Sequence, residues 1–190
     1  MIIGVNYRSS YSFIDESSED LMSYVQDTID EACADIDIQY KVFSESAIAI
    51  SESVVDKIRE VVGNIVHSVI NWFEGAKKKF HEFVARTQQV KNPKKDSKSV
   101  QKMEAIDVEY EDVNTKLSSM EDDVKDAGKE AVAAAKNTEQ DPEASKEVLG
   151  KFKSRVNSIV NRAKSVYKKY GISIETPHHN PWADKNKAKA

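Results

Sequence analysis

The sequence predicts an all-α fold, an elongated helical bundle of about four helices with extended N- and C-terminal segments. Between Met22 and Phe83 an apolar residue recurs every three or four positions, with a mean spacing of about 3.6, the period of an α-helix. Between Tyr110 and Ala134 the mean spacing is about 3.5, which is typical of a heptad seam. The 190 residues include only six glycines and four prolines, and 32% are charged. This balance suits an elongated helical protein with much solvated surface.

The first part of the chain is predicted to be an extended arm followed by a long helical region. Residues 1–16 have no helical period, and Ser17 is a candidate helix cap, so we expect an extended N-terminal arm over 1–16 and helix over 17–90. One long helix over 18–89 and a pair of helices, at about 18–43 and 52–89, both fit the apolar stripe. We favour the pair, because residues 44–53 are rich in serine, which competes for backbone hydrogen bonds.

The apolar face becomes wider from Val54 onward and includes Trp72, Phe73, Phe80 and Phe83. A wide apolar face indicates that a helix contacts more than one other helix. We therefore predict that the segment from Val54 to Phe83 is the central element of the bundle.

A basic and polar linker over 91–107 and a helical hairpin over 108–171 are predicted next. The hairpin helices are expected at about 108–136 and 142–170, because Asp141 can cap and Pro142 can occupy a first helical position. Gly171 marks the end of the second helix. Residues 172–190 have no period and are predicted to form an extended tail, in which Trp182 packs either on the chain's own helices or on a partner.

Charge is segregated along the chain, although the formal net charge is only −4. Residues 1–50 carry ten acidic and two basic side chains, and residues 104–143 carry thirteen and four. Residues 144–190 reverse the balance, with eleven basic and three acidic side chains. We predict that helices of opposite sign pair, either within one chain or between copies.

The chain carries no pattern that indicates catalysis or metal binding. His67, Glu74 and His81 share a helix face, but seven residues span about 10.5 Å, so they cannot converge on one metal ion. The single cysteine, Cys33, lies close to the apolar stripe, between Glu31 and Asp35, and is interpreted as a small buried hydrophobe. Glycine-rich phosphate loops and nucleophile motifs are missing from the sequence. We predict that the protein is not an enzyme and uses no cofactor, metal or small-molecule substrate.

The predicted function is that of a structural or assembly protein, acting through helix–helix contacts with a protein partner or with copies of itself. The lysine-, serine- and acid-rich helical composition is similar to that of small accessory or internal virion proteins of tailed bacteriophages. This similarity implies a virion component. The residues predicted to mediate protein contacts are Trp72, Phe73, Phe80, Phe83, Tyr110, Leu117, Phe152 and Trp182.

A first alternative follows from residues 69–80, where aromatic side chains and three lysines occupy opposite sides of one helix. Such a helix is typical of an amphipathic membrane-surface or toxin-like protein. The second alternative is weak binding to a nucleic-acid backbone. Its candidate anion contacts are Lys77, Lys78, Lys79, Lys94 and Lys95.

The N-terminal residues lack the basic and apolar regions of a secretory signal, and no run approaches the ~18–20 apolar residues of a membrane span. We expect a soluble intracellular protein, or one contained within an assembled particle.

Overall fold

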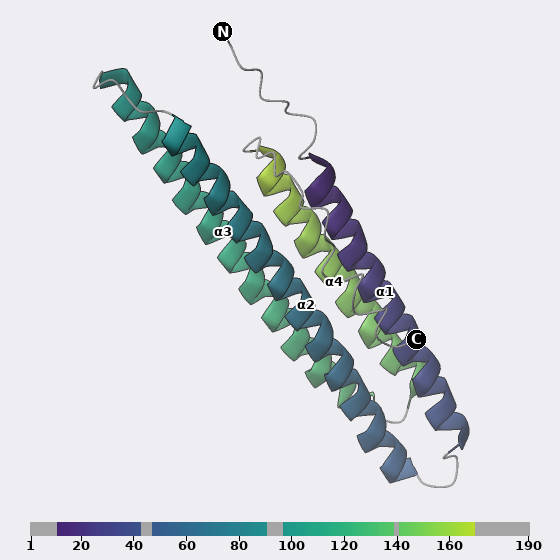
Figure 1. Cartoon of the computed structure of the whole chain (residues 1–190). Helices are drawn as coiled ribbons and strands as arrows, with labels where there is room; N and C mark the ends of the chain where they lie inside the picture. The colour runs from purple at the N-terminus through teal and green to yellow at the C-terminus, as the bar shows by residue number, and fades with distance from the viewer. Residues whose placement is uncertain (1–10, 43–46, 91–96, 139–140, 170–190) are drawn as a thin grey trace.

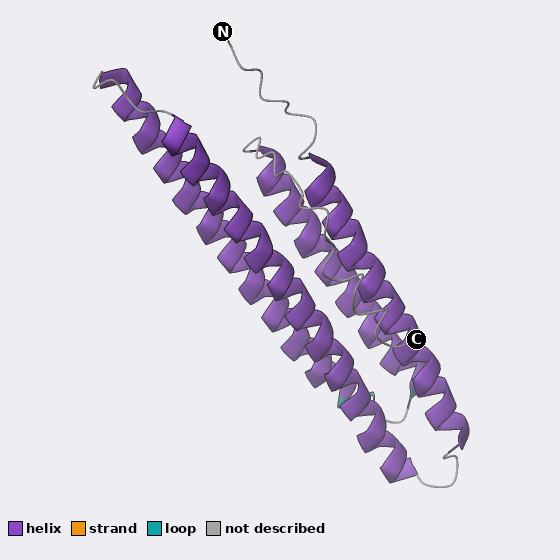
Figure 2. Ribbon diagram, viewed as in Figure 1, coloured by secondary structure: helices purple, strands orange, loops and turns teal. Residues whose placement is uncertain are grey.

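A computed structural model shows an all-α protein with four long helices, and it describes residues 11–42, 47–90, 97–138 and 141–169. The helices are α1 (Tyr11–Val42), α2 (Ala47–Val90), α3 (Ser97–Ala135) and α4 (Pro142–Lys169). Within the described residues no strand is present, and only the short turn before α4 is non-helical (Figure 2). The predicted fold class is therefore confirmed.

The four helices form an up-down-up-down bundle. Each helix packs against its neighbours in the ring α1–α2–α3–α4, and α1 packs against α4 to close the ring (Figure 1). Because α1 packs against α2, the chain reverses direction between them. The stripe at the start of the chain therefore forms a pair of helices, as the serine-rich segment predicted, and not one long helix.

Three helix starts differ from the prediction. Helix α2 begins at Ala47, earlier than the predicted start at about 52. Helix α1 begins at Tyr11, so the arm predicted over 1–16 is wrong for residues 11–16. Helix α3 begins at Ser97, so the linker predicted over 91–107 is wrong for residues 97–107. Both segments extend a helix that forms next to them, and lengthening an existing helix costs far less than starting one. Residues 1–10, 91–96 and 170–190 lie outside the described residues.

Apolar side chains from all four helices form one continuous core. Ile29, Ile65, Leu117 and Ile159 each come from a different helix, and each is buried. The largest contribution comes from α2, as its wide apolar face predicted. The buried apolar residues of α2 are Val54, Val55, Ile58, Val61, Val62, Ile65, Val69, Trp72, Phe73, Ala76 and Phe80.

Charge alternates around the ring of helices. Helix α1 carries nine acidic side chains and one basic side chain, and α3 carries ten acidic and five basic side chains. Helix α2 carries five acidic and six basic side chains, and α4 carries two and eight. Every side of the ring therefore joins an acidic helix to a more basic one.

Ion pairs cross each of the four sides of the ring. They include Lys57 with Asp35 at 2.8 Å, Lys77 with Glu121 at 2.8 Å, Arg162 with Asp123 at 2.5 Å and Lys146 with Asp37 at 2.7 Å. The predicted pairing of oppositely charged helices is thus confirmed within one chain.

Candidate interaction surfaces

Most of the residues predicted to contact a partner lie inside the chain's own core. The side chains of Trp72, Phe73, Phe80, Leu117 and Phe152 are all buried. The Trp72 and Phe73 rings meet edge to face, with centroids 5.1 Å apart and an interplanar angle of 74°. This packing is one of the favoured arrangements of aromatic pairs. In this structure these five side chains hold the bundle together.

The remaining predicted contact residues lie where the structure gives less detail. Phe83 and Tyr110 belong to α2 and α3, but their side chains are not among those described. Trp182 lies outside the described residues.

The lysines predicted to contact anions do not form one cluster. Lys77 Nζ donates to Ser118 Oγ at 3.0 Å and lies 2.8 Å from Glu121 Oε1, so this lysine links α2 to α3. Lys78 is exposed on α2. The side chain of Lys79 is not described, and Lys94 and Lys95 lie outside the described residues.

A polar cluster between α2, α3 and α4 was not anticipated from the sequence. Glu121, paired with Lys77, also acts through its charge on Tyr167 of α4, which is buried. Burial raises the pKa of Tyr167, and the negative charge of Glu121 raises it further. The Tyr167 hydroxyl has no hydrogen-bond partner among the described residues. Such contacts depend on the three-dimensional register of the helices, which no spacing within one helix reveals.

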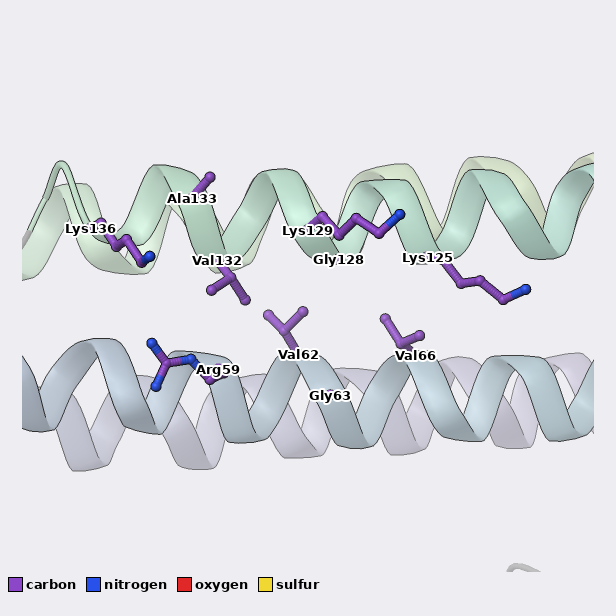
Figure 3. A pocket seen from close by; sticks show the side chains of 10 residues that line it. All are labelled: Arg59, Val62, Gly63, Val66, Lys125, Gly128, Lys129, Val132, Ala133 and Lys136. Carbon is purple, nitrogen blue, oxygen red and sulfur yellow. The ribbon is translucent and has the colours of Figure 1, made fainter.

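A shallow groove of about 450 Å³ runs along the outer side of α2 and α3 (Figure 3). We call it the α2–α3 groove. Val62 and Val66 point from α2 toward α3, and Val132 points back from α3. The lining residues are Arg59, Val62, Gly63, Val66, Lys125, Gly128, Lys129, Val132, Ala133 and Lys136.

Two glycines give the groove its shape. A Cβ on Gly128 would come within 2.8 Å of Val66 Cγ2 and 3.4 Å of Val62 Cγ1, so α3 approaches α2 closely at this point. A Cβ on Gly63 would have nothing within 4 Å, so the surface above Gly63 is open. The groove therefore has an apolar floor where the helices touch and an open wall on the α2 side.

All four charged residues that line the groove are basic, although α3 as a whole is acidic. Arg59, Lys125 and Lys129 each pair with an aspartate three residues earlier on their own helix. Exposed ion pairs of this kind contribute little to stability, so another carboxylate can replace the aspartate at small cost.

A second hollow of about 400 Å³ lies between α3 and α4 beside the turn that joins them. Its floor includes Ala127, Ala131 and Phe152, and its rim mixes acidic with basic side chains. This mixed rim favours no particular sign of ligand charge.

Among the described residues, the histidines are His67 and His81 of α2, and the cysteine is Cys33 of α1. No group of three or more potential metal ligands occurs in the part of the chain that the structure describes. Cys33 is half-buried on α1, and burial raises the pKa of its thiol, which disfavours the reactive thiolate. None of the described helices is long and apolar enough to cross a lipid bilayer.

Helices α2 and α3 continue past the start of α1 and the end of α4 (Figure 1). Trp72 Nε1 donates a hydrogen bond to Ser17 Oγ at 3.1 Å, so these two residues lie at the same height along the bundle axis. From this contact α1 continues to Tyr11, about 9 Å, whereas α2 continues to Val90, about 27 Å. We call residues 82–90 and 97–110 the α2–α3 extension.

Comparison with known proteins assigns no relative to this fold or its surfaces, since the chain matches no protein-family model, no curated protein and no solved structure.

Proposed function

We propose that the protein is a non-enzymatic structural or assembly component that acts through helix–helix contacts, either with a partner protein or with copies of itself. The observation that carries the proposal is the α2–α3 extension, which continues beyond the reach of α1 and α4. In the four-helix part, α1 and α4 cover the inner faces of α2 and α3. The extension lacks this cover from the described helices.

The sequence of the extension supports the same conclusion. The apolar stripes of the bundle continue into it, with Phe83 on α2 and with Ile106 and Tyr110 on α3. Two helices alone cannot surround both of their apolar stripes, and helical proteins resolve this by adding further helices. Helices from another chain would complete a four-helix arrangement there. An accessory or internal virion component is the setting that the composition favours.

The test is the solution mass of the full chain, measured by sedimentation over a range of concentrations. The wild type is expected to form oligomers, and the double substitution of Phe83→Glu and Tyr110→Glu should weaken them, because it places charge on the apolar stripes of the extension. Glu74→Gln is the matched control, since Glu74 is an exposed residue of α2 within the four-helix part.

A monomer at every concentration would overturn self-association and leave partner binding as the remaining form of the proposal. Flotation with anionic vesicles then separates partner binding from the membrane-surface alternative. That alternative requires Trp72 and Phe73 to leave the core, so strong flotation that is lost on Trp72→Ala with Phe73→Ala would contradict assembly.

A further inference from the structure

We propose that the α2–α3 groove receives helix α1 of a second copy of this chain, with the acidic outer stripe of α1 lying against the basic rim. This inference rests on the proposed function, because it names the partner and one surface through which the assembly forms. It concerns a different surface from the α2–α3 extension, so each can be tested separately.

The first argument is charge complementarity. The groove presents Arg59, Lys125, Lys129 and Lys136 and no acidic lining residue. Helix α1 has the largest excess of acidic over basic side chains among the four helices, with nine acidic and one basic, whereas α3 has ten acidic and five basic. Its outer face exposes Asp27, Asp30 and Glu31. Complementary surfaces of this kind steer association and fix its register.

The second argument is the spacing of the charges. Asp27 and Glu31 are four residues apart, as are Lys125 and Lys129, so each pair is separated by about 6 Å along its helix. With α1 of the second copy parallel to α3, Asp27 lies level with Lys125 and Glu31 lies level with Lys129. Both pairs of charges are then matched at once.

The third argument is the position of the apolar residues in that same register. Beyond Glu31, the outer face of α1 exposes Ala34 and then Ile38, which is 57% exposed and is the one large exposed hydrophobic residue found among the described side chains. Ile38 lies seven residues past Glu31, and Lys136 lies seven past Lys129. Ala34 therefore comes level with Val132, and Ile38 comes level with Lys136, about one turn beyond Val132 at the end of the groove. An antiparallel register would instead place Ile38 beyond the groove.

The two surfaces lie on different sides of one chain, so each copy can donate its α1 to one neighbour and receive the α1 of another. Such a contact is heterologous and generates rings or filaments of copies that point the same way. The expected mass distribution therefore extends beyond a dimer as concentration rises.

The experiment uses two charge-reversed forms of the full chain, Lys125→Glu with Lys129→Glu in the groove and Asp27→Lys with Glu31→Lys on α1. Each form alone should associate at least about tenfold more weakly than the wild type, because charged pairs become like-charge contacts. Mixing the two forms should restore association, since each reversed surface then meets an opposite charge. Association of the wild type should weaken as salt is added.

Two further variants separate loss of docking from loss of folding. Gly63→Gln fills the open wall of the groove at a position where a Cβ meets nothing within 4 Å, so the helix should keep its fold while association falls. Lys151→Glu is the matched control, because Lys151 is an exposed lysine of α4 with its own local ion pair to Glu147. It should leave association unchanged.

The inference is overturned if the two charge-reversed forms associate as the wild type does, or if mixing them restores nothing. Association that is lost in the Phe83→Glu and Tyr110→Glu form but kept in the groove variants would also overturn it while supporting the proposed function. A wild type that stays monomeric would exclude a second copy as the occupant of the groove and would overturn this inference. Partner binding through the α2–α3 extension would still be tested separately.

Discussion

Lys77 Nζ lies 2.8 Å from Glu121 Oε1 and joins α2 to α3, and the charge of Glu121 acts on the buried Tyr167 of α4. The two charged side chains are only 22% and 13% exposed, so most of the water around them has been removed. Removing one partner of such a pair leaves a poorly solvated charge behind, whereas removing both can be nearly neutral.

The first prediction therefore concerns Lys77→Met, which should lower the free energy of unfolding by about 2–4 kcal/mol, measured by denaturant titration. The double substitution of Lys77→Met and Glu121→Met should recover most of this loss. Lys78→Met is the control, because Lys78 is exposed on the same helix. Equal unfolding midpoints for Lys77→Met and Lys78→Met would show that the pair of Lys77 and Glu121 does not contribute to the free energy of unfolding.

The second prediction is that Tyr167→Phe stabilises the bundle by about 1 kcal/mol at neutral pH. The Tyr167 hydroxyl is buried without a hydrogen-bond partner among the described residues, and burying such a group costs free energy. Denaturant titration at neutral pH measures the gain, with Tyr24→Phe at a half-buried position of α1 as the control. A loss of stability would indicate that the hydroxyl is satisfied by bound water.

Tyr167 also makes stability depend on alkaline pH. Its pKa is raised in the folded state, so the folded state holds the proton more tightly than the unfolded state does. The part of the folding stability that depends on protonated Tyr167 is fully present below about pH 10, the ordinary pKa of tyrosine. It is lost as the pH rises above that value. Titrations across this range should show a smaller loss for Tyr167→Phe than for the wild type. Some loss remains, because the pKa of Lys57 is raised by its hydrogen bond to Asp35.

The third prediction compares two glycines inside helices. Gly75→Ala should raise the free energy of unfolding by about 0.5–1 kcal/mol, because alanine favours helix and the new Cβ meets nothing within 4 Å. Gly128→Ala should lower it by about 1–2 kcal/mol, since the new Cβ would lie 2.8 Å from Val66 Cγ2 in the tight contact between α2 and α3. Thermal unfolding followed by circular dichroism measures both. Equal gains in the two variants would mean that α2 and α3 separate easily at this point.

The fourth prediction concerns the start of α4. Asp141 Oδ1 accepts hydrogen bonds from the backbone N–H groups of Glu143 at 3.0 Å and Ala144 at 3.1 Å. Asp141→Ala should lower the free energy of unfolding by about 1 kcal/mol, whereas Asp141→Asn keeps an acceptor and should lose less. Denaturant titration of the three proteins measures both changes. If the alanine and asparagine variants are equally stable, capping does not hold this helix end.

The sequence determines most of the fold because the relevant signals are local. The apolar spacing of Ile29 or Ile65 reflects one helix face, and Asp141 with Pro142 marks a helix start that the structure confirms at Pro142. The start of α3 at Ser97 was missed, since residues 97–109 are strongly charged and their apolar residues Ile106 and Val108 alternate like a strand. Lysine, glutamine, methionine and glutamate nevertheless favour helix, and their combined preference was the better guide.

The candidate surfaces were less predictable because they depend on how helices meet. The aromatic residues Trp72 and Phe73 could serve a partner or the chain's own core, and only the packing of four helices places them in the core. Likewise, the α2–α3 groove exists because Gly128 lies opposite Val62 and Val66. This juxtaposition depends on the register between two helices, which the spacing within either helix does not determine.

The ring of helices also has a consequence for the order of folding. Three of its sides join helices that follow each other in the chain, but the fourth joins α1 to α4 across the whole sequence. Closing that side costs the most chain entropy, so we expect its contacts to form last. The ion pair of Lys146 with Asp37 lies there, at 2.7 Å. Asp37→Asn should then accelerate unfolding and leave the refolding rate nearly unchanged in stopped-flow measurements.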